Sequence, residues 1–283
     1  MSASGPKQSL TRVGFVGAGR VGTALAWHCR KAGFGFAGLT DRDLKQAQVA
    51  YQRLGLRFRR LESSELAQRS DVLFLTVPDR AVASVFQAAR PLPGTIVAHC
   101  SGALGLEVFE DYEAAGLEVL ALHPVQVFAS YTQAIRSLPG SWWALDGSEK
   151  GMAFGRRLVR LLRGRAVTVR SEVRPAWHAA CVFASNFQAA LFDAVERIGP
   201  SLGMTPGRIV EILTPLARAA LESVLRHGPV RALTGPVERG DAETVNSHLA
   251  ALARVSPELV PMYRELSRRL VELARSRKQN AES

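Results

Sequence analysis

Three glycines near the N-terminus constrain the fold of this chain more than any other feature. Gly17, Gly19 and Gly22 have the spacing G-x-G-x-x-G, between a short apolar run (12–17) and a helical stretch (20–32). In such a context the first glycine permits a sharp turn, the second leaves room for a pyrophosphate, and the third lets helix and strand pack closely. The free N–H groups and the positive dipole end of the helix also favour phosphate. The motif therefore predicts a dinucleotide site built from Gly17, Ala18, Gly19, Arg20, Val21 and Gly22.

The first half of the chain alternates short apolar stretches with helical stretches. Such an alternation indicates right-handed βαβ units and a mostly parallel sheet. The predicted fold class is therefore a doubly wound α/β domain over residues 1–170, in which residues 1–10 form a disordered tail. Strands are expected at 12–17 and 35–41, within 56–63, and at 71–79, 94–103, 118–125, 141–147 and 166–170.

The pattern becomes all-helical after residue 170, so a second domain for substrate binding and dimerisation is expected over residues 171–283. Its first helix, 174–199, has a proline near its start, a glycine at its end and apolar residues on nearly every side. We therefore expect one buried central helix, packed against the first domain and against a partner subunit in a symmetric homodimer. Further helix starts are expected at Pro206, with a kink at Pro215, at Asp241 and at 256–257.

The composition narrows the class of protein. The formal net charge is +11, but the arginines that supply most of it are scattered, which is not typical of a nucleic-acid surface. A positive field also suits a small anionic ligand. Cys29, Cys100 and Cys181 lie far apart and form no C-x-x-C pair, so we expect small buried residues in a reducing compartment. No run of 18 apolar residues and no apolar signal segment is present, so a cytoplasmic protein without membrane or metal partners is expected.

The residues after the second expected strand bear on the choice of dinucleotide. Asp41 lies 19 positions after Gly22, where an acidic residue binds the ribose hydroxyls of NAD. Arg42 can instead pair with the 2′-phosphate of NADP, whereas Asp43 would repel that phosphate. The cofactor is therefore expected to be NADP or NAD, with the preference open.

A further cofactor contact is expected where the strand at 71–79 ends. The carboxyl ends of the strands line the ligand crevice of a doubly wound sheet. Val77 and Pro78 are therefore expected to form an apolar wall beside the cofactor, and Asp79 to cap the helix that follows.

Six motifs occur in an order that resembles one known group of proteins. The chain resembles Rossmann-like proteins with a C-terminal helical domain of unknown function, in the superfamily of 6-phosphogluconate dehydrogenase, ketopantoate reductase, pyrroline-5-carboxylate reductase and prephenate dehydrogenase. The resemblance spans about residues 12–270 and implies an NAD(P)-binding domain, a helical domain that often dimerises, and a dehydrogenase or reductase activity. The motifs are GFVGAGRVGTALA, VPDRAV, HCSGALG, LHPVQVF, HAACVFASNF and LTGPVERGDAETVNSHL.

One departure from the resembled hydroxyacid dehydrogenases concerns proton transfer. Those enzymes carry a lysine four residues before an asparagine on the long helix between the domains. Asn186 matches the asparagine, but Val182 stands at the lysine position. The proton chemistry of those enzymes therefore does not carry over to this chain.

Hydride transfer to or from a small substrate needs a group that exchanges a proton, and histidine titrates near neutrality. His123 precedes a proline at a strand end, and His178 lies on the long helix. Ser101 follows a strand, and in the resembled dehydrogenases a serine there binds substrate. The candidate catalytic residues are therefore His123, His178, Ser101 and Asn186, each of which could instead be structural. Arg239 could bind a substrate carboxylate or form an ion pair between domains or subunits.

Two functions remain open on these residues. The first is an oxidoreductase that moves a hydride between NAD(P) and a small carbonyl, hydroxy-acid or imine substrate. The second is a noncatalytic dinucleotide-binding module that senses redox state or assembles with a partner. The polar set favours the enzyme, whereas the missing lysine favours the sensor.

Overall fold

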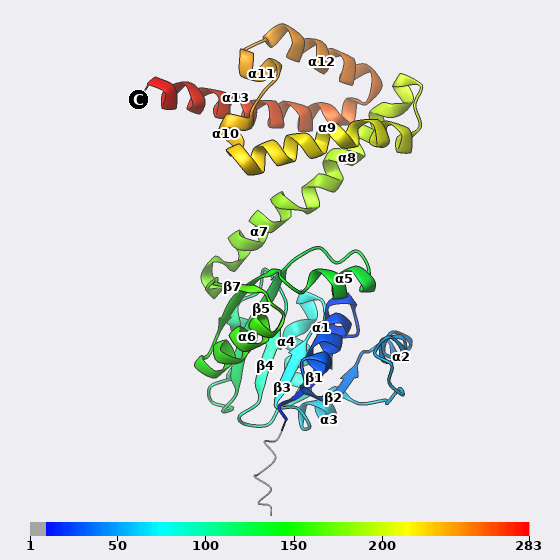
Figure 1. Ribbon diagram of the computed structural model, residues 1–283, viewed down its shortest axis with the longest axis vertical. Helices are drawn as coiled ribbons and strands as arrows, with labels where there is room; N and C mark the ends of the chain where they lie inside the picture. The colour runs from blue at the N-terminus through cyan, green and yellow to red at the C-terminus, as the bar shows by residue number, and fades with distance from the viewer. Residues whose placement is uncertain (1–9, 283) are drawn as a thin grey trace, which may run out of the picture. The chain divides into compact units, whose positions relative to one another are not determined.

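The structure is a computed structural model that describes residues 10–282 (Figure 1). The tail predicted for residues 1–10 lies outside the described residues, except for its last position. The chain divides into two compact units, of which the first ends at Phe183 and the second begins at Ala184. The division comes after the expected boundary at 170 because the first turns of helix α7 (Arg174–Ala184) belong to the sheet unit.

The first unit is built on a seven-stranded sheet with the order β2-β1-β3-β4-β5-β6-β7. Neighbouring strands are parallel except for β5 and β6, which are antiparallel. This arrangement confirms the predicted doubly wound, mostly parallel sheet. The strands are β1 (Arg12–Val16), β2 (Gly35–Thr40), β3 (Val72–Leu75), β4 (Ile96–His99), β5 (Glu118–Val125), β6 (Trp142–Gly147) and β7 (Arg165–Thr168).

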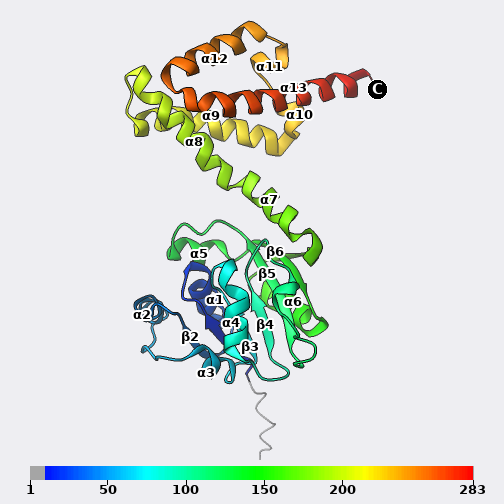
Figure 2. The same cartoon turned by 180° about the vertical axis from the view of Figure 1, so that it is seen from behind.

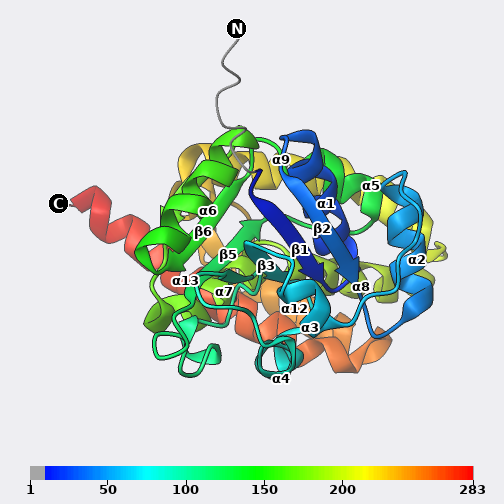
Figure 3. The same ribbon diagram turned by 90° about the horizontal axis from the view of Figure 1, so that it is seen from below.

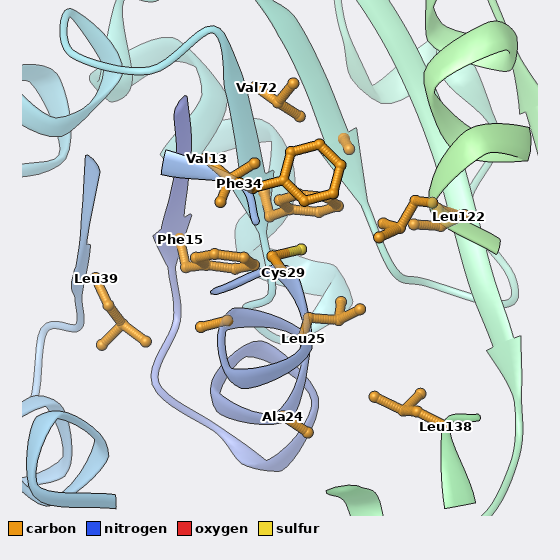
Figure 4. Close-up of a cluster of buried hydrophobic side chains, with 14 of the residues drawn as sticks. Val13, Phe15, Ala24, Leu25, Cys29, Phe34, Leu39, Val72, Leu122 and Leu138 are labelled. Carbon is orange, nitrogen blue, oxygen red and sulfur yellow. The ribbon is translucent and has the colours of Figure 1, made fainter. Parts of the chain in front are cut away.

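Helices cover both faces of this sheet, and each face has its own apolar core. On one face, α1 and α6 pack against the sheet (Figures 1 and 3). Phe15 lies in the core of this face (Figure 4). Its ring stacks on that of Phe74, with centroids 4.9 Å apart. On the other face, α3 and α4 cover a second core (Figure 2). The helices of this unit that precede α7 are α1 (Arg20–Lys31), α2 (Leu44–Arg53), α3 (Ser63–Ala67), α4 (Val82–Ala89), α5 (Tyr131–Ser137) and α6 (Glu149–Leu161).

The cysteines of the structure are free thiols. Cys29 is fully buried in the first core, and burial raises the pKa of its thiol. Burial also raises the pKa of Cys100 to about 12. Both thiols are therefore protonated at neutral pH, and Cys29 in particular acts as a small apolar residue, as expected.

The strand expected within 56–63 does not form, and this prediction is wrong. The segment is a loop that leads into α3, with Leu56 and Phe58 packed on the core and Arg57, Arg59 and Arg60 exposed. Phe58 contacts Tyr51 of α2 edge to face, with ring centroids 5.6 Å apart. The alternation of apolar and basic residues therefore reflects packing against a helix and not pairing in a sheet.

The described residues of the second unit form helices joined by short loops, with no strand among them. Asp241 caps α12, as expected, because its carboxylate accepts a hydrogen bond from the backbone N–H of Thr244 (3.0 Å). Pro215 lies inside α9. The helices are α8 (Asn186–Ile198), α9 (Pro206–His227), α10 (Pro229–Ala232), α11 (Pro236–Arg239), α12 (Ala242–Val255) and α13 (Val260–Glu282).

The single helix expected over 174–199 is wrong, because two helices form. The helix is interrupted at Ser185, whose backbone angles (φ −129°, ψ −69°) are not helical, so α7 and α8 are separate. In addition, Arg174 is the only buried residue among those of α7 and α8. Phe183 is 69% exposed and Phe187 is 44% exposed.

Candidate functional site

The glycine motif forms a tight turn between β1 and α1, and each glycine has a different reason to be there. Gly17 has φ of +110°, and a Cβ atom on it would lie 2.4 Å from the carbonyl oxygen of Thr76. A Cβ atom on Gly22 would lie 2.2 Å from the carbonyl oxygen of Gly17. A Cβ atom on Gly19, in contrast, would meet no described atom within 4 Å. Gly17 and Gly22 are therefore required by the fold, whereas Gly19 leaves space open.

The start of α1 is left without a capping side chain. Gly19 is its N-cap residue, no side chain hydrogen-bonds to the cap, and no acidic residue lies in the first turn. The first N–H groups of a helix have no acceptor within the helix, and they attract anions together with the helix dipole. The space beside Gly19 therefore fits the pyrophosphate of a dinucleotide.

A cavity of about 910 Å³ opens at this turn. It is lined by most of the residues expected to bind cofactor, namely Gly17, Gly19, Arg20, Val21, Asp41, Arg42, Val77 and Pro78. Ala18 and Gly22 support the turn instead of lining the cavity. The sequence did not indicate that Phe128 and Arg80 also line it. Phe128 is held there because its carbonyl oxygen accepts a hydrogen bond from the Arg20 guanidinium (3.1 Å), a contact across 108 residues.

Asp41 is bound to the turn by its own carboxylate. One oxygen accepts the N–H of Ala18 (2.7 Å), and the other accepts the N–H of Asp43 (2.9 Å). Asp43 in turn caps α2 by accepting from the N–H of Lys45 (2.9 Å). Asp43 is therefore engaged at the helix start, which weakens the expectation that it repels a phosphate beside Arg42.

A second cluster of polar residues lies around Gly102, after β4. A Cβ atom on Gly102 would lie 2.9 Å from Nε2 of His123 and 2.5 Å from Nδ1 of His178. The two imidazole rings meet edge to face, with centroids 5.9 Å apart. Both candidate histidines are therefore brought together within the first unit, and glycine at position 102 makes room for them.

Ser101 lies beside this cluster, but its hydroxyl is used within the chain. It donates to a carboxylate oxygen of Asp79 (2.8 Å) and accepts from the N–H groups of Ala103 (3.1 Å) and Leu104 (3.0 Å). A hydroxyl has one proton to donate and two acceptor positions, so all of them are taken. Ser101 therefore organises the loop, and Asp79 binds Ser101 instead of capping the next helix. Because Asp79 follows Pro78, this bond also connects the cluster to the cavity.

Arg174 is a fully buried cation that anchors the start of α7. Its guanidinium donates to the carbonyl oxygens of Ser101 (3.1 Å), Ala121 (3.2 Å) and Ala144 (3.1 Å). No acidic residue in the described chain forms a salt bridge with it, and burial lowers its pKa. It therefore fixes α7, and with it His178, to the sheet. The sequence offered no signal for this role, since arginine is rarely buried.

Burial and nearby cations keep two histidines of this region neutral. Burial lowers the pKa of His123 to about 4, with smaller contributions from the nearby His178 and Arg174. Burial likewise lowers the pKa of His99 to about 4. His99 accepts the N–H of Ser101 at Nδ1 (3.2 Å), and its Nε2 lies 3.1 Å from the carbonyl oxygen of Gly105. Its neutral ring therefore carries its proton on Nε2 and donates it to that carbonyl.

The stability of the protein is expected to fall on mild acidification because of these neutral histidines. An unfolded histidine takes up a proton near pH 6.5, whereas folded His99 resists protonation down to about pH 4. The free energy of unfolding is therefore unaffected by the titration of His99 above pH 6.5 and decreases as the pH falls from 6.5 to about 4. His99 alone accounts for a decrease of up to about 1.4 kcal/mol per pH unit. Urea unfolding at pH 7.5, 6 and 5 measures this slope. The exposed His227→Gln variant should keep the slope, and equal stability at pH 7.5 and 5 would contradict the expectation.

The remaining candidate residues lie in the second unit. Asn186 begins α8 and is exposed, and its amide oxygen accepts a hydrogen bond from the Ser185 hydroxyl (2.9 Å). Arg239 ends α11 and is also exposed. The roles proposed for both residues stay predictions. Among residues 10–282, no group of three or more His, Cys, Asp or Glu side chains could hold a metal ion, and no described helix is both long and apolar enough for a membrane span.

Comparison with known proteins agrees with the resemblance noted in the sequence. Residues 1–124 match the Rossmann-like domain, and residues 141–270 match a domain of unknown function, DUF2520. These matches confirm the resemblance. No curated protein matches the sequence.

Solved structures share the fold over nearly the whole chain. A candidate NADP oxidoreductase from Bacteroides fragilis is 22% identical, with 93% of this chain and 98% of that chain covered and a TM-score of 0.78. Protein TM1727 from Thermotoga maritima is 25% identical, with 94% and 99% covered and a TM-score of 0.70. An imine reductase from Myxococcus stipitatus, solved with NADP+, is 17% identical, with 95% and 94% covered and a TM-score of 0.62.

Proposed function

We propose that this chain, which joins a Rossmann-like domain to a DUF2520 domain, is an NAD(P)-dependent oxidoreductase acting on a small carbonyl, hydroxy-acid or imine compound. The observation that carries the proposal is the open space at Gly19, beside an uncapped helix start and a cavity of about 910 Å³. The solved imine reductase with NADP+ supports the same class of reaction, since it shares the fold.

Different residues would bind the cofactor and act on the substrate. The turn at Gly19 and the start of α1 would hold the pyrophosphate, and Val77 and Pro78 would form an apolar wall beside the rest of the cofactor. When bound, a nicotinamide dinucleotide supplies or accepts the hydride. His178 would exchange the proton, and His123 would donate a hydrogen bond that polarises the substrate. Ser101 would position the loop around Gly102 instead of contacting substrate.

The direct test is a screen of carbonyl acids, ketones and imines, in which NAD(P)H absorbance is followed with the full chain. Oxidation of NAD(P)H that depends on substrate and is lost in Gly19→Val would support the proposal. Dinucleotide binding without turnover across the panel would instead favour the redox sensor, the second function suggested by Val182 in place of a lysine.

Arg42 is expected to decide the preference for NADP. It lines the cavity, and both oxygens of Asp41 already accept backbone N–H groups of the chain. Arg42→Ala should therefore weaken NADPH binding by about 1–3 kcal/mol, the strength of a hydrogen bond to a charged group, and spare NADH. Asp41→Ala is the matched control, and it should weaken both cofactors because it releases the N–H of Ala18. Titration calorimetry with each cofactor measures the effect, and selective loss of NADH in Asp41→Ala would indicate an NAD enzyme.

We also propose that the protein is a cytoplasmic homodimer. The free, buried thiols suit a reducing compartment. Large apolar side chains are exposed along α8 and α9, and exposed apolar surface on this scale is typical of an interface. They are Phe187, Leu191, Ile212, Leu216, Leu221, Val224 and Leu225.

Light scattering at micromolar concentration should therefore give twice the chain mass of 30.7 kDa. Leu216→Asp, at a site that is 67% exposed, should shift the protein toward monomer because it places a charge in the interface. Leu92→Asp in the first unit, at a site that is 50% exposed, is the control and should not. A wild-type monomer would contradict the dimer.

A further inference from the structure

The two ring nitrogens of His123 face different groups. Its Nδ1 atom receives the indole N–H of Trp177 (3.4 Å). Its Nε2 atom points to the other side, toward Gly102, where a Cβ atom would lie 2.9 Å away. The indole N–H of Trp177 therefore faces one edge of the His123 ring, and Gly102 faces the other edge.

An indole N–H can only donate, so the Nδ1 atom that faces it offers a lone pair. A neutral imidazole has one proton, and the proton of His123 is therefore on Nε2. If Nδ1 of His123 carried a proton, its N–H would face the indole N–H of Trp177, and no hydrogen bond could form between them. We propose that Trp177 is a positioning residue that holds His123 in its Nε2–H tautomer, so that His123 is a fixed hydrogen-bond donor beside Gly102.

His178 supplies the complementary group. Its Nδ1 atom is buried, has no hydrogen-bond partner within the described chain, and lies 2.5 Å from the same Cβ position on Gly102. Nε2 of His123 and Nδ1 of His178 therefore both lie against Gly102. Such a pair suits an oxygen or nitrogen that is a hydroxyl or amine in one state and a carbonyl or imine in the other.

The catalytic roles that we assign to His178 and His123 rest on the proposed oxidoreductase function. In the direction of oxidation, the O–H or N–H proton of the substrate would pass to Nδ1 of His178, and a bound oxidised dinucleotide would accept the hydride from the carbon. The C–H bond and the O–H or N–H bond break, and the C=O or C=N π bond forms. Reduction reverses each step. His123 keeps its own proton throughout and donates a hydrogen bond to the reacting oxygen or nitrogen.

The charges around His123 favour the same neutral state. His178 and Arg174 of α7 and His99 of β4 disfavour a positive charge on it, and only Asp79 favours one. Burial adds to this, and the pKa of His123 falls to about 4. The ring is therefore a neutral donor across the neutral pH range, and it is unsuited to be the base.

Nitrogen-15 NMR of the full chain tests the tautomer without any substrate. At pH 7, His123 should show a protonated Nε2 and an unprotonated Nδ1, with the signals assigned by their loss in His123→Gln. Trp177→Phe keeps an aromatic ring and removes the N–H. This variant should give a mixture of tautomers and raise the pKa of His123 by about one unit, as expected for one lost hydrogen bond. Trp142→Phe, at an exposed tryptophan of β6, is the matched control and should change neither property.

A wild-type His123 that carries its proton on Nδ1 would overturn the proposal, whether or not the variant folds. An unchanged tautomer in a folded Trp177→Phe protein would also overturn it. The outcome is separate from the proposed function. The expected tautomer without turnover on any substrate would reject the oxidoreductase and leave the role of Trp177 intact, and turnover with the other tautomer would do the reverse.

Discussion

Replacing Gly19 by valine is expected to abolish dinucleotide binding while the protein stays folded. The valine side chain would point into the cavity, where no described atom lies within 4 Å, so the fold has room for it. It would occupy the space beside the uncapped start of α1, which is where the pyrophosphate would bind. Affinity for both NADH and NADPH should fall by more than about 100-fold, or about 2.7 kcal/mol, in titration calorimetry.

Gly22→Val provides the contrasting control for this experiment. Its Cβ atom would lie 2.2 Å from both the Gly17 carbonyl oxygen and the Thr76 hydroxyl oxygen. This variant should therefore lower the stability of the folded protein itself. Thermal unfolding distinguishes the two variants, since Gly19→Val should melt near the wild type. Unchanged affinity for both cofactors in Gly19→Val would reject the dinucleotide site.

Replacing His178 beside Gly102 by glutamine should lower turnover by about 100- to 10,000-fold once a substrate is known, because the variant loses the group that exchanges the proton. Replacing His123 by glutamine should lower turnover less, since the amide still offers an N–H donor. Glutamine can hydrogen-bond but cannot exchange a proton, so His178→Gln removes the group whose buried Nδ1 has no partner in the described chain. His123→Gln removes the ring that Trp177 holds in place. Cofactor affinity should be unchanged in both variants, because neither histidine lines the cavity.

Steady-state kinetics and cofactor titration on the same preparations measure these effects. The exposed His227→Gln variant in the second unit is the matched control and should keep wild-type turnover. Near-normal turnover in both His123→Gln and His178→Gln would mean that the proton passes through water or through the cofactor ribose. The assignment of the histidine pair would then be wrong.

The sequence by itself determined the features that depend on local spacing. The glycine turn could be predicted because its three glycines act within six residues, and the structure shows the tight contacts of Gly17 and Gly22. The parallel sheet could be predicted because alternating strands and helices have few ways to fold. Local pattern failed where packing decided the outcome. Residues 56–63 alternate like a strand but pack on α2, and the helix over 174–199 is interrupted at Ser185.

Only the tertiary structure decided which polar groups meet. The hydroxyl of Ser101 binds Asp79 across 22 residues, and the indole of Trp177 reaches His123 across 54. Arg174 reaches the carbonyl oxygen of Ser101 across 73 residues. No periodicity encodes such contacts, because each depends on the order of strands in the sheet and on the point where α7 joins it. The sequence predicted His123 and His178 as candidates, but the fold places both at Gly102, gives Nδ1 of His123 the indole N–H of Trp177, and leaves Nδ1 of His178 without a hydrogen-bond partner in the described chain.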